Sequence, residues 1–300
     1  MQNEGHVNID TSRFGIKGVL RKKQWWYFEG IDTEQRLYYV FLALQAFPAS
    51  YVSIKIIDYQ NNRRFTEDHM GSFISEPSSR VKVSASGKWG FMRFSGSAEQ
   101  GWIIDVSTET VKAQCFHIPI APLHVNHLLT QHIDYTINQF INNEATGTIK
   151  IEGSEMKLNG RGYHEHNWGV QPRHSTANWL HFWGRDIAGV ALSCHYDAGV
   201  PHHYTCLWHD KKMNYLYSPV QFGFDPAHPQ KPWTVKSPDI DLIITPIAGH
   251  HTRMEIPPLI EYLHIDYYEQ LLELKGHAVI RGENVSIEGT GKLDHNWNRW

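Results

Sequence analysis

Two histidines and an acid lie close together between Gly160 and Gly169, where the sequence reads Gly-Arg-Gly-Tyr-His-Glu-His-Asn-Trp-Gly. Alternate residues of a β-strand share one face, so His164 and His166 would point the same way. Imidazoles suit zinc or copper, which makes a metal site one interpretation. Glu165 would point to the opposite face, however, and this weakens the metal interpretation.

The same string recurs in weaker form at the end of the chain. Residues 289–297 read Gly-Thr-Gly-Lys-Leu-Asp-His-Asn-Trp, and adding 129 to each number from 160 to 168 gives its counterpart. Chemistry rarely needs to occur twice in one pseudo-symmetric chain, whereas a structural contact does. We therefore interpret acid-His-Asn-Trp as a buried polar network that joins strand ends. His164 is matched by Leu293 and so remains a candidate for lining a pocket.

Residues that the two halves do not share are better candidates for chemistry. Residues 25–32 follow the pattern Trp-x-x-Phe-x-Gly-x-Asp, which recurs 154 positions later at residues 179–186. In this alignment His181 and Trp183 replace Tyr27 and Glu29. The second half would therefore carry an imidazole and an indole on one face of one strand.

A candidate proton donor follows downstream. Trp208 and Asp210 would share a strand face, with Tyr204 and Cys206 nearby and His195 on an intervening strand. If these strands are neighbours, the carboxyl group lies among indoles and imidazoles. An apolar environment disfavours the charged form, so the carboxyl pKa would rise and the acid could donate a proton near neutrality.

The surroundings of Asp210 allow two interpretations. Tryptophan faces would stabilise a developing cation by about 2 kcal/mol when desolvated. The alternative is that Asp210 lies in a solvated turn, because His-Asp-Lys-Lys at residues 209–212 is typical of a loop.

The elements that must position these residues are predicted to be strands. Short runs of β-branched and aromatic residues alternate with Gly and Ser turns, and no long stretch shows a convincing helical period. Together with the repeat, this pattern predicts an all-β protein made of two tandem antiparallel β-barrels. We expect one barrel over residues 1–170 and the other over residues 171–300.

Composition excludes several classes of protein. A chain of 300 residues with a net charge of −3 has no basic field for nucleic acid. Its three cysteines are too few for a disulfide framework, which favours free buried thiols. The first residues do not resemble a signal peptide, and no apolar run reaches the ~20 residues of a membrane span. We expect a soluble cytoplasmic protein, monomeric or homodimeric, without stable membrane insertion.

The run Trp25-Trp26-Tyr27-Phe28, the string from Gly162 to Gly169 and the tandem layout resemble the carotenoid 1,2-hydratase (hydroxyneurosporene synthase) family. Its lipocalin-like superfamily also includes fungal decalin-forming Diels–Alderases. The resemblance implies two lipocalin-like barrels with a pocket for a small apolar substrate and no cofactor.

The resemblance also implies roles for particular residues. A His-x-Trp strand and a later aromatic-x-Asp pair are implicated in catalysis by the hydratases. His181-Phe182-Trp183 is similar to the first, and Trp208-His209-Asp210 to the second. Trp208 stands where the hydratases have Tyr, and it lacks the hydroxyl that could position water. This difference leaves proton-initiated cyclisation open beside hydration.

Three hypotheses result, beside a metal enzyme as a fourth and minor one. The first is a cofactor-free cyclase or hydratase of an isoprenoid or polyene, with Asp210 as the acid and His181 as the orienting group. Its substrate-binding residues would be Trp183, Trp208, His195, His164 and Tyr204. The second is a pericyclase that works by folding its substrate. The third is a non-catalytic binder of apolar ligands.

Overall fold

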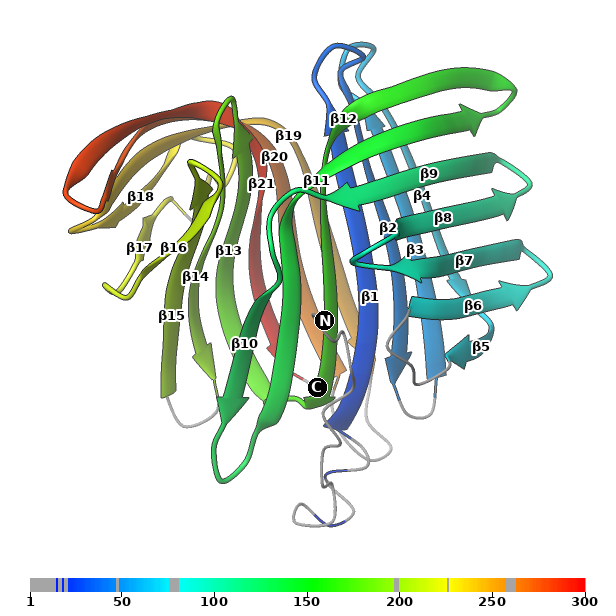
Figure 1. The fold of residues 1–300 in the computed structure, drawn as a ribbon. Coiled ribbons are helices and arrows are strands. Elements are labelled where there is room, and N and C mark those ends of the chain that lie inside the picture. Colours follow the sequence, from blue (N-terminus) through cyan, green and yellow to red (C-terminus); the bar gives the residue numbers. More distant parts are fainter. Residues whose placement is uncertain are drawn as a thin grey trace. The chain divides into compact units, whose positions relative to one another are not determined.

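The computed structural model describes residues 15, 18, 21–46, 49–75, 81–196, 200–225, 227–256 and 263–299. The chain divides into two compact units, Met1–Gln171 and Pro172–Trp300. Figure 1 shows strands throughout both units. Each sheet is curled, and the prediction of an all-β chain with two tandem lipocalin-like barrels is confirmed. Among the described residues, no helix is both long and apolar enough to span a bilayer.

The described residues of the first unit form twelve strands in one sheet. They are β1 (Lys22–Asp32), β2 (Leu37–Ala46), β3 (Ala49–Asp58), β4 (Arg63–Met70), β5 (Ser72–Ser75), β6 (Val81–Gly87), β7 (Gly90–Ser97), β8 (Gly101–Thr108), β9 (Val111–Pro119), β10 (His124–Leu129), β11 (Asp134–Ile151) and β12 (Ser154–Val170). Their order is β4-β3-β2-β1-β12-β11-β9-β8-β7-β6-β5, with β10 paired to β11.

Where the structure describes it, the second unit forms nine strands in one sheet. They are β13 (His174–Gly184), β14 (Ile187–Tyr196), β15 (Val200–His209), β16 (Lys212–Leu216), β17 (Gln221–Gly223), β18 (Trp233–Ser237), β19 (Ile240–Ile256), β20 (Leu263–Ile280) and β21 (Glu283–Arg299). Their order is β16-β15-β14-β13-β21-β20-β19-β18-β17.

In both sheets the two end strands are consecutive in the chain. Only Gly71 separates β4 from β5, and residues 217–220 separate β16 from β17. A side chain at Gly71 would bring its Cβ within 2.6 Å of the Ser86 carbonyl oxygen, so the close passage of the chain here requires glycine. The polypeptide therefore links the two edges of each sheet, and each sheet curls round its own core (Figure 1).

The repeat of 129 residues is visible in the strands themselves. Adding 129 to the bounds of β11, 134 and 151, gives 263 and 280, the bounds of β20. Adding it to the bounds of β12, 154 and 170, gives 283 and 299, the bounds of β21. The longest hairpin of each barrel is thus the duplicated segment.

The second predicted repeat, at 154 residues, does not mark equivalent positions. Phe28 pairs with His164 across β1 and β12, and Leu180 pairs with Leu293 across β13 and β21. Because His164 and Leu293 are 129 apart, Phe28 is equivalent to Leu180, at an offset of 152. A shift of two residues leaves each side chain on its face but changes its counterpart. His181 therefore corresponds to Glu29.

Alternate residues of β1 and β13 face the two cores. Phe28 lies in the first core and Phe182 in the second, so Trp25, Tyr27, Trp179 and their alternates lie on the opposite faces. In each barrel an aromatic ring covers a glycine of the neighbouring strand, but the strand that carries the glycine differs between the barrels. Tyr39 of β2 covers Gly30 of β1, whereas Phe182 of β13 covers Gly189 of β14.

All three cysteines are free and buried, as predicted. Burial raises the pKa of each of these thiols to about 12. Such thiols are inert parts of the packing.

Candidate functional site

One face of the second sheet gathers several of the predicted residues. We call the face opposite the second core the site face. Across β13, β14 and β15, His181 is in register with Val190 and then Cys206. Trp183 is in register with Ala188 and then Trp208 by the same ladders. His181, Trp183 and Trp208 therefore share the site face, as does Tyr204, which pairs with Leu192.

Asp210 is not part of this group. It is exposed in the two-residue turn between β15 and β16, with φ of 49° at Asp210 and 56° at Lys211. Two consecutive positive φ values are typical of the tight turn that joins twisted hairpin strands, and Asp tolerates this conformation. The expectation of an apolar aromatic environment for this carboxyl group was wrong, and the alternative of a solvated turn describes it.

His195 and His164 also lie elsewhere. His195 is exposed near the end of β14 and pairs with Thr176, so it belongs to the face of the second core. His164 is fully buried in the first barrel, stacked on Phe28 at 3.9 Å between ring centroids. Its Nδ1 lies 3.0 Å from the Tyr27 carbonyl oxygen, and burial lowers its pKa to about 3. Neither histidine joins the site face.

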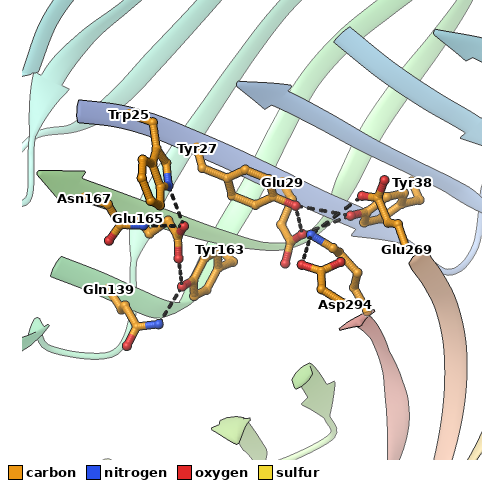
Figure 2. Close-up of polar contacts among 11 residues, drawn as sticks. Trp25, Tyr27, Glu29, Tyr38, Gln139, Tyr163, Glu165, Asn167, Glu269 and Asp294 are labelled. Atoms are coloured by element: carbon orange, nitrogen blue, oxygen red, sulfur yellow. Dashed lines mark hydrogen bonds and ion pairs between the residues drawn. The ribbon is translucent and has the colours of Figure 1, made fainter. Parts of the chain in front are cut away.

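The site face contains a charged group that the sequence analysis did not single out. Lys292 Nζ lies 2.8 Å from Asp294 Oδ2 and 3.6 Å from Glu269 Oε1. All three side chains are buried, Lys292 with only 2% of its surface exposed. Strand register places Asp294 between Trp179 of β13 and Glu269 of β20. Figure 2 shows Glu269 and Asp294 reaching from adjacent strands.

Asp294 combines an unusual proton affinity with an open oxygen. Burial raises its pKa to about 6, Lys292 opposes this shift, and Glu269 adds to it. Oδ2 contacts Lys292, whereas Oδ1 has no hydrogen-bond partner among the described residues. A buried carboxyl group that is half-protonated near pH 6 and has one unused oxygen can donate a proton to a ligand.

The first barrel has a hydrogen-bonded group without a lysine at the equivalent positions. Gln139, Tyr163 and Glu165 correspond in the strand ladders to Glu269, Lys292 and Asp294. Gln139 Nε2 donates to Tyr163 Oη at 2.7 Å, and Tyr163 Oη donates to Glu165 Oε2 at 2.5 Å (Figure 2).

Glu165 is otherwise fully occupied. Its Oε1 accepts from Trp25 Nε1 at 2.9 Å and from Asn167 Nδ2 at 2.7 Å. In the first copy the acid thus serves as a structural acceptor, as the acid-His-Asn-Trp interpretation expects, although Asn167 Oδ1 has no partner among the described residues. In the second copy the acid is Asp294, whose Oδ1 is left open. The substitution of Lys for Tyr inside the repeat was the sequence signal that could have revealed this difference.

The first sheet holds a second buried carboxylate on the face that carries Glu165. Glu29 Oε2 accepts from Tyr27 Oη at 2.5 Å and from Tyr38 Oη at 2.9 Å (Figure 2). Two phenol donors on one oxygen stabilise the ionised form.

No metal-binding arrangement is present on the part of the chain that the structure describes: no group of three His, Cys, Asp or Glu residues could hold an ion there. His164 stacks on Phe28, and His166 stacks on Trp26 and lies 2.9 Å from Gln24 Nε2. Both imidazoles of the string therefore serve packing and hydrogen bonding.

Residues 3–260 match the family described as Domain of unknown function (DUF2804). The chain belongs to this family. A search of curated proteins finds no match.

Solved structures share the fold of this DUF2804 protein. CghA with Sch210972 is 9% identical, with a TM-score of 0.68 over 93% of this chain and 89% of that one. An AttH-like protein of Nitrosomonas europaea is 12% identical, with a TM-score of 0.65 over 91% and 92%. Kievitone hydratase from Nectria haematococca is 12% identical, with a TM-score of 0.60 over 94% and 91%. The resemblance to the lipocalin-like superfamily is thereby confirmed at the level of the fold.

Proposed function

We propose that this DUF2804 protein is a cofactor-independent hydratase or cyclase of a small, largely apolar unsaturated metabolite. The observation that carries the proposal is Asp294, a buried carboxyl group held by Lys292 on one oxygen and open on the other. Asp294 takes the acid role that the sequence suggested for Asp210, because Asp210 is exposed in a turn. The fold shared with kievitone hydratase and CghA supports this class of reaction.

The proposed steps balance without a cofactor. The Asp294 carboxyl proton adds to one carbon of an alkene, which leaves a carbocation and a carboxylate. Lys292, 2.8 Å away, stabilises the new carboxylate. In the hydratase, water attacks the cation and its released proton returns to Asp294. In the cyclase, a second double bond attacks the cation, and the new cation loses a proton from a neighbouring carbon to Asp294. Trp183 and Trp208 offer aromatic faces to the cation, and His181 lies on the same face to orient the substrate.

Solvent deuterium provides the test. The protein is incubated in deuterium oxide with isoprenoid polyenes from sesquiterpene to carotenoid length, and products are analysed by mass spectrometry. Asp294→Asn should lower the rate about 10²–10⁴-fold, the usual contribution of general acid catalysis. The matched control is Asp210→Asn, whose exposed side chain lies outside the site face. A wild-type rate in Asp294→Asn would refute the acid role.

A pericyclase is the second candidate function. The aromatic lining of the site face, with Trp183, Trp208 and Tyr204, favours it because such surfaces can fold a polyene into a reactive shape. In that case the product contains no solvent deuterium, and Trp183→Ala lowers the rate more than Asp294→Asn does. The opposite ranking of the two variants would count against a pericyclase.

A further inference from the structure

Two buried indole N–H groups on the site face have no acceptor among the described residues. Nε1 of Trp179 and Nε1 of Trp183 are both enclosed and make no hydrogen bond there. The two residues are four positions apart on β13, so their side chains project from the same face. A buried donor without an acceptor is costly, and folded proteins normally provide one.

Elsewhere the chain does provide acceptors for buried indoles. Trp25 Nε1 donates to Glu165 at 2.9 Å, and Trp233 Nε1 donates to the Pro229 carbonyl at 2.7 Å. Trp89 and Trp102 of the first unit also lack an acceptor, but neither stands on a strand face with a second open indole. Trp179 and Trp183 therefore differ from these residues because two open indole N–H groups lie on the same face of one strand.

The charged group next to these indoles can add one more donor. Trp179 pairs with Asp294 and His181 with Lys292 in the β13–β21 ladder. The Lys292 ammonium already contacts Asp294 and Glu269, whereas Asp294 can donate through its open oxygen when it is protonated. A ligand oxygen on this face can therefore accept from an indole N–H, and from protonated Asp294.

The balance of charge favours a neutral acceptor. The ammonium of Lys292 is offset by Glu269 at 3.6 Å, and Asp294 adds a negative charge whenever it is ionised. This charged group therefore has no surplus positive charge to bind a carboxylate or phosphate. A ketone, aldehyde, ester or lactone oxygen accepts hydrogen bonds without bringing a charge.

We propose that the substrate is an unsaturated metabolite with a neutral carbonyl group, whose oxygen accepts a hydrogen bond from Trp179 or Trp183. This inference names the substrate class and rests on the proposed function for its location. The expected substrate is thus an oxygenated polyene and not a pure hydrocarbon.

Binding of three matched probes tests the proposal. Farnesal, β-farnesene and farnesoate share one carbon skeleton and differ in bearing an aldehyde, no oxygen or a carboxylate. Isothermal titration calorimetry is performed on the full-length Asp294→Asn protein, so that turnover does not interfere. Farnesal should bind about fivefold to tenfold more tightly than β-farnesene, the effect of one or two hydrogen bonds, and more tightly than farnesoate.

Variants assign the preference to the indole nitrogens. Trp179→Phe and Trp183→Phe keep an aromatic ring but remove the N–H, so at least one of them should weaken farnesal binding severalfold and both should leave β-farnesene binding unchanged. Trp297→Phe is the control, since Trp297 is 41% exposed and pairs with Thr176 on the other face.

Three outcomes would overturn the proposal: equal affinity for farnesal and β-farnesene, tightest binding of farnesoate, or no binding of any probe. The calorimetry needs no turnover, so its failure is distinct from a failure of the acid role. A farnesal preference with a fully active Asp294→Asn enzyme would retain the substrate class and discard the mechanism.

Discussion

Lys292 and Tyr163 occupy the same position of the duplicated hairpin, 129 residues apart, on strands β21 and β12. Tyr163 joins Gln139 and Glu165 by hydrogen bonds, whereas Lys292 joins Glu269 and Asp294 by ion pairs. One backbone geometry thus carries a hydrogen-bonded tyrosine in the first barrel and an ion-paired lysine in the second. The charged version contains the carboxyl group whose proton can be transferred.

The first prediction is that the hydrogen-bonded group of the first barrel can be transplanted into the second. Lys292→Met leaves two buried carboxyl groups without their cation and should destabilise the protein by about 3–5 kcal/mol. The triple variant Glu269→Gln, Lys292→Tyr, Asp294→Glu copies the first barrel and should recover most of that loss while remaining inactive. Urea unfolding monitored by circular dichroism measures both. A triple variant less stable than Lys292→Met would contradict the equivalence of the two positions.

The second prediction concerns pH and Asp294. Its pKa is about 6 in the folded protein, against an ordinary value of 3.8. The folded state therefore holds this proton more tightly than the unfolded chain does. The resulting stability is present below pH ~4 and is lost as the pH rises through ~6. Its size is at most about 3 kcal/mol.

Asp294→Asn removes this titration. Urea unfolding at intervals from pH 4 to pH 7 should show a smaller loss of stability with rising pH in the variant. Activity should also fall as the pH rises above ~6, because the acid must be protonated. If wild type and variant lose stability in parallel over this range, the carboxyl group does not have the raised pKa.

The third prediction concerns His164 in the first core. Burial lowers its pKa from 6.5 to about 3, so the unfolded chain takes up a proton that the folded protein refuses. The protein should therefore lose stability as the pH falls below ~6.5. His164→Leu introduces the residue that the second barrel has at the equivalent position, Leu293.

The variant should lessen the acid sensitivity by about 1.4 kcal/mol per pH unit between pH ~6 and ~4, the value for one proton. Thermal unfolding of both proteins across this range measures the slope. An unchanged slope in His164→Leu would show that this imidazole titrates normally in the folded state.

The fourth prediction concerns the turn at Asp210. Because its φ is 49°, Asp210→Gly should be neutral or slightly stabilising. Asp210→Val should cost about 1–2 kcal/mol, since a β-branched residue resists this conformation. Neither variant should alter the rate of product formation in the deuterium assay. A large loss of activity in Asp210→Gly with unchanged stability would restore a chemical role to this aspartate.

Much of the fold could be predicted because the repeat and the strand patterns are local. The 129-residue offset survives as the bounds of two complete hairpins. A bulge between Phe140 and Asn143 shifts the pairing of β11 with β12 by one residue, whereas β20 and β21 pair without a shift. The 154-residue offset differs by two residues from the offset of 152 that relates equivalent positions of β1 and β13. A slip of two leaves the pattern of inward and outward residues intact, so periodicity could not detect it.

The amino-acid sequence by itself determined that the chain is a duplicated β unit, and that His181 and Trp183 share a face. Only the tertiary structure decided which face holds the core, because both faces of β1 and β13 carry large apolar side chains. It also decided which carboxyl group is buried. Asp210 lies in a turn set by local backbone geometry, whereas Asp294 meets Lys292 and Glu269 through pairing of β20 and β21, where desolvation raises its pKa.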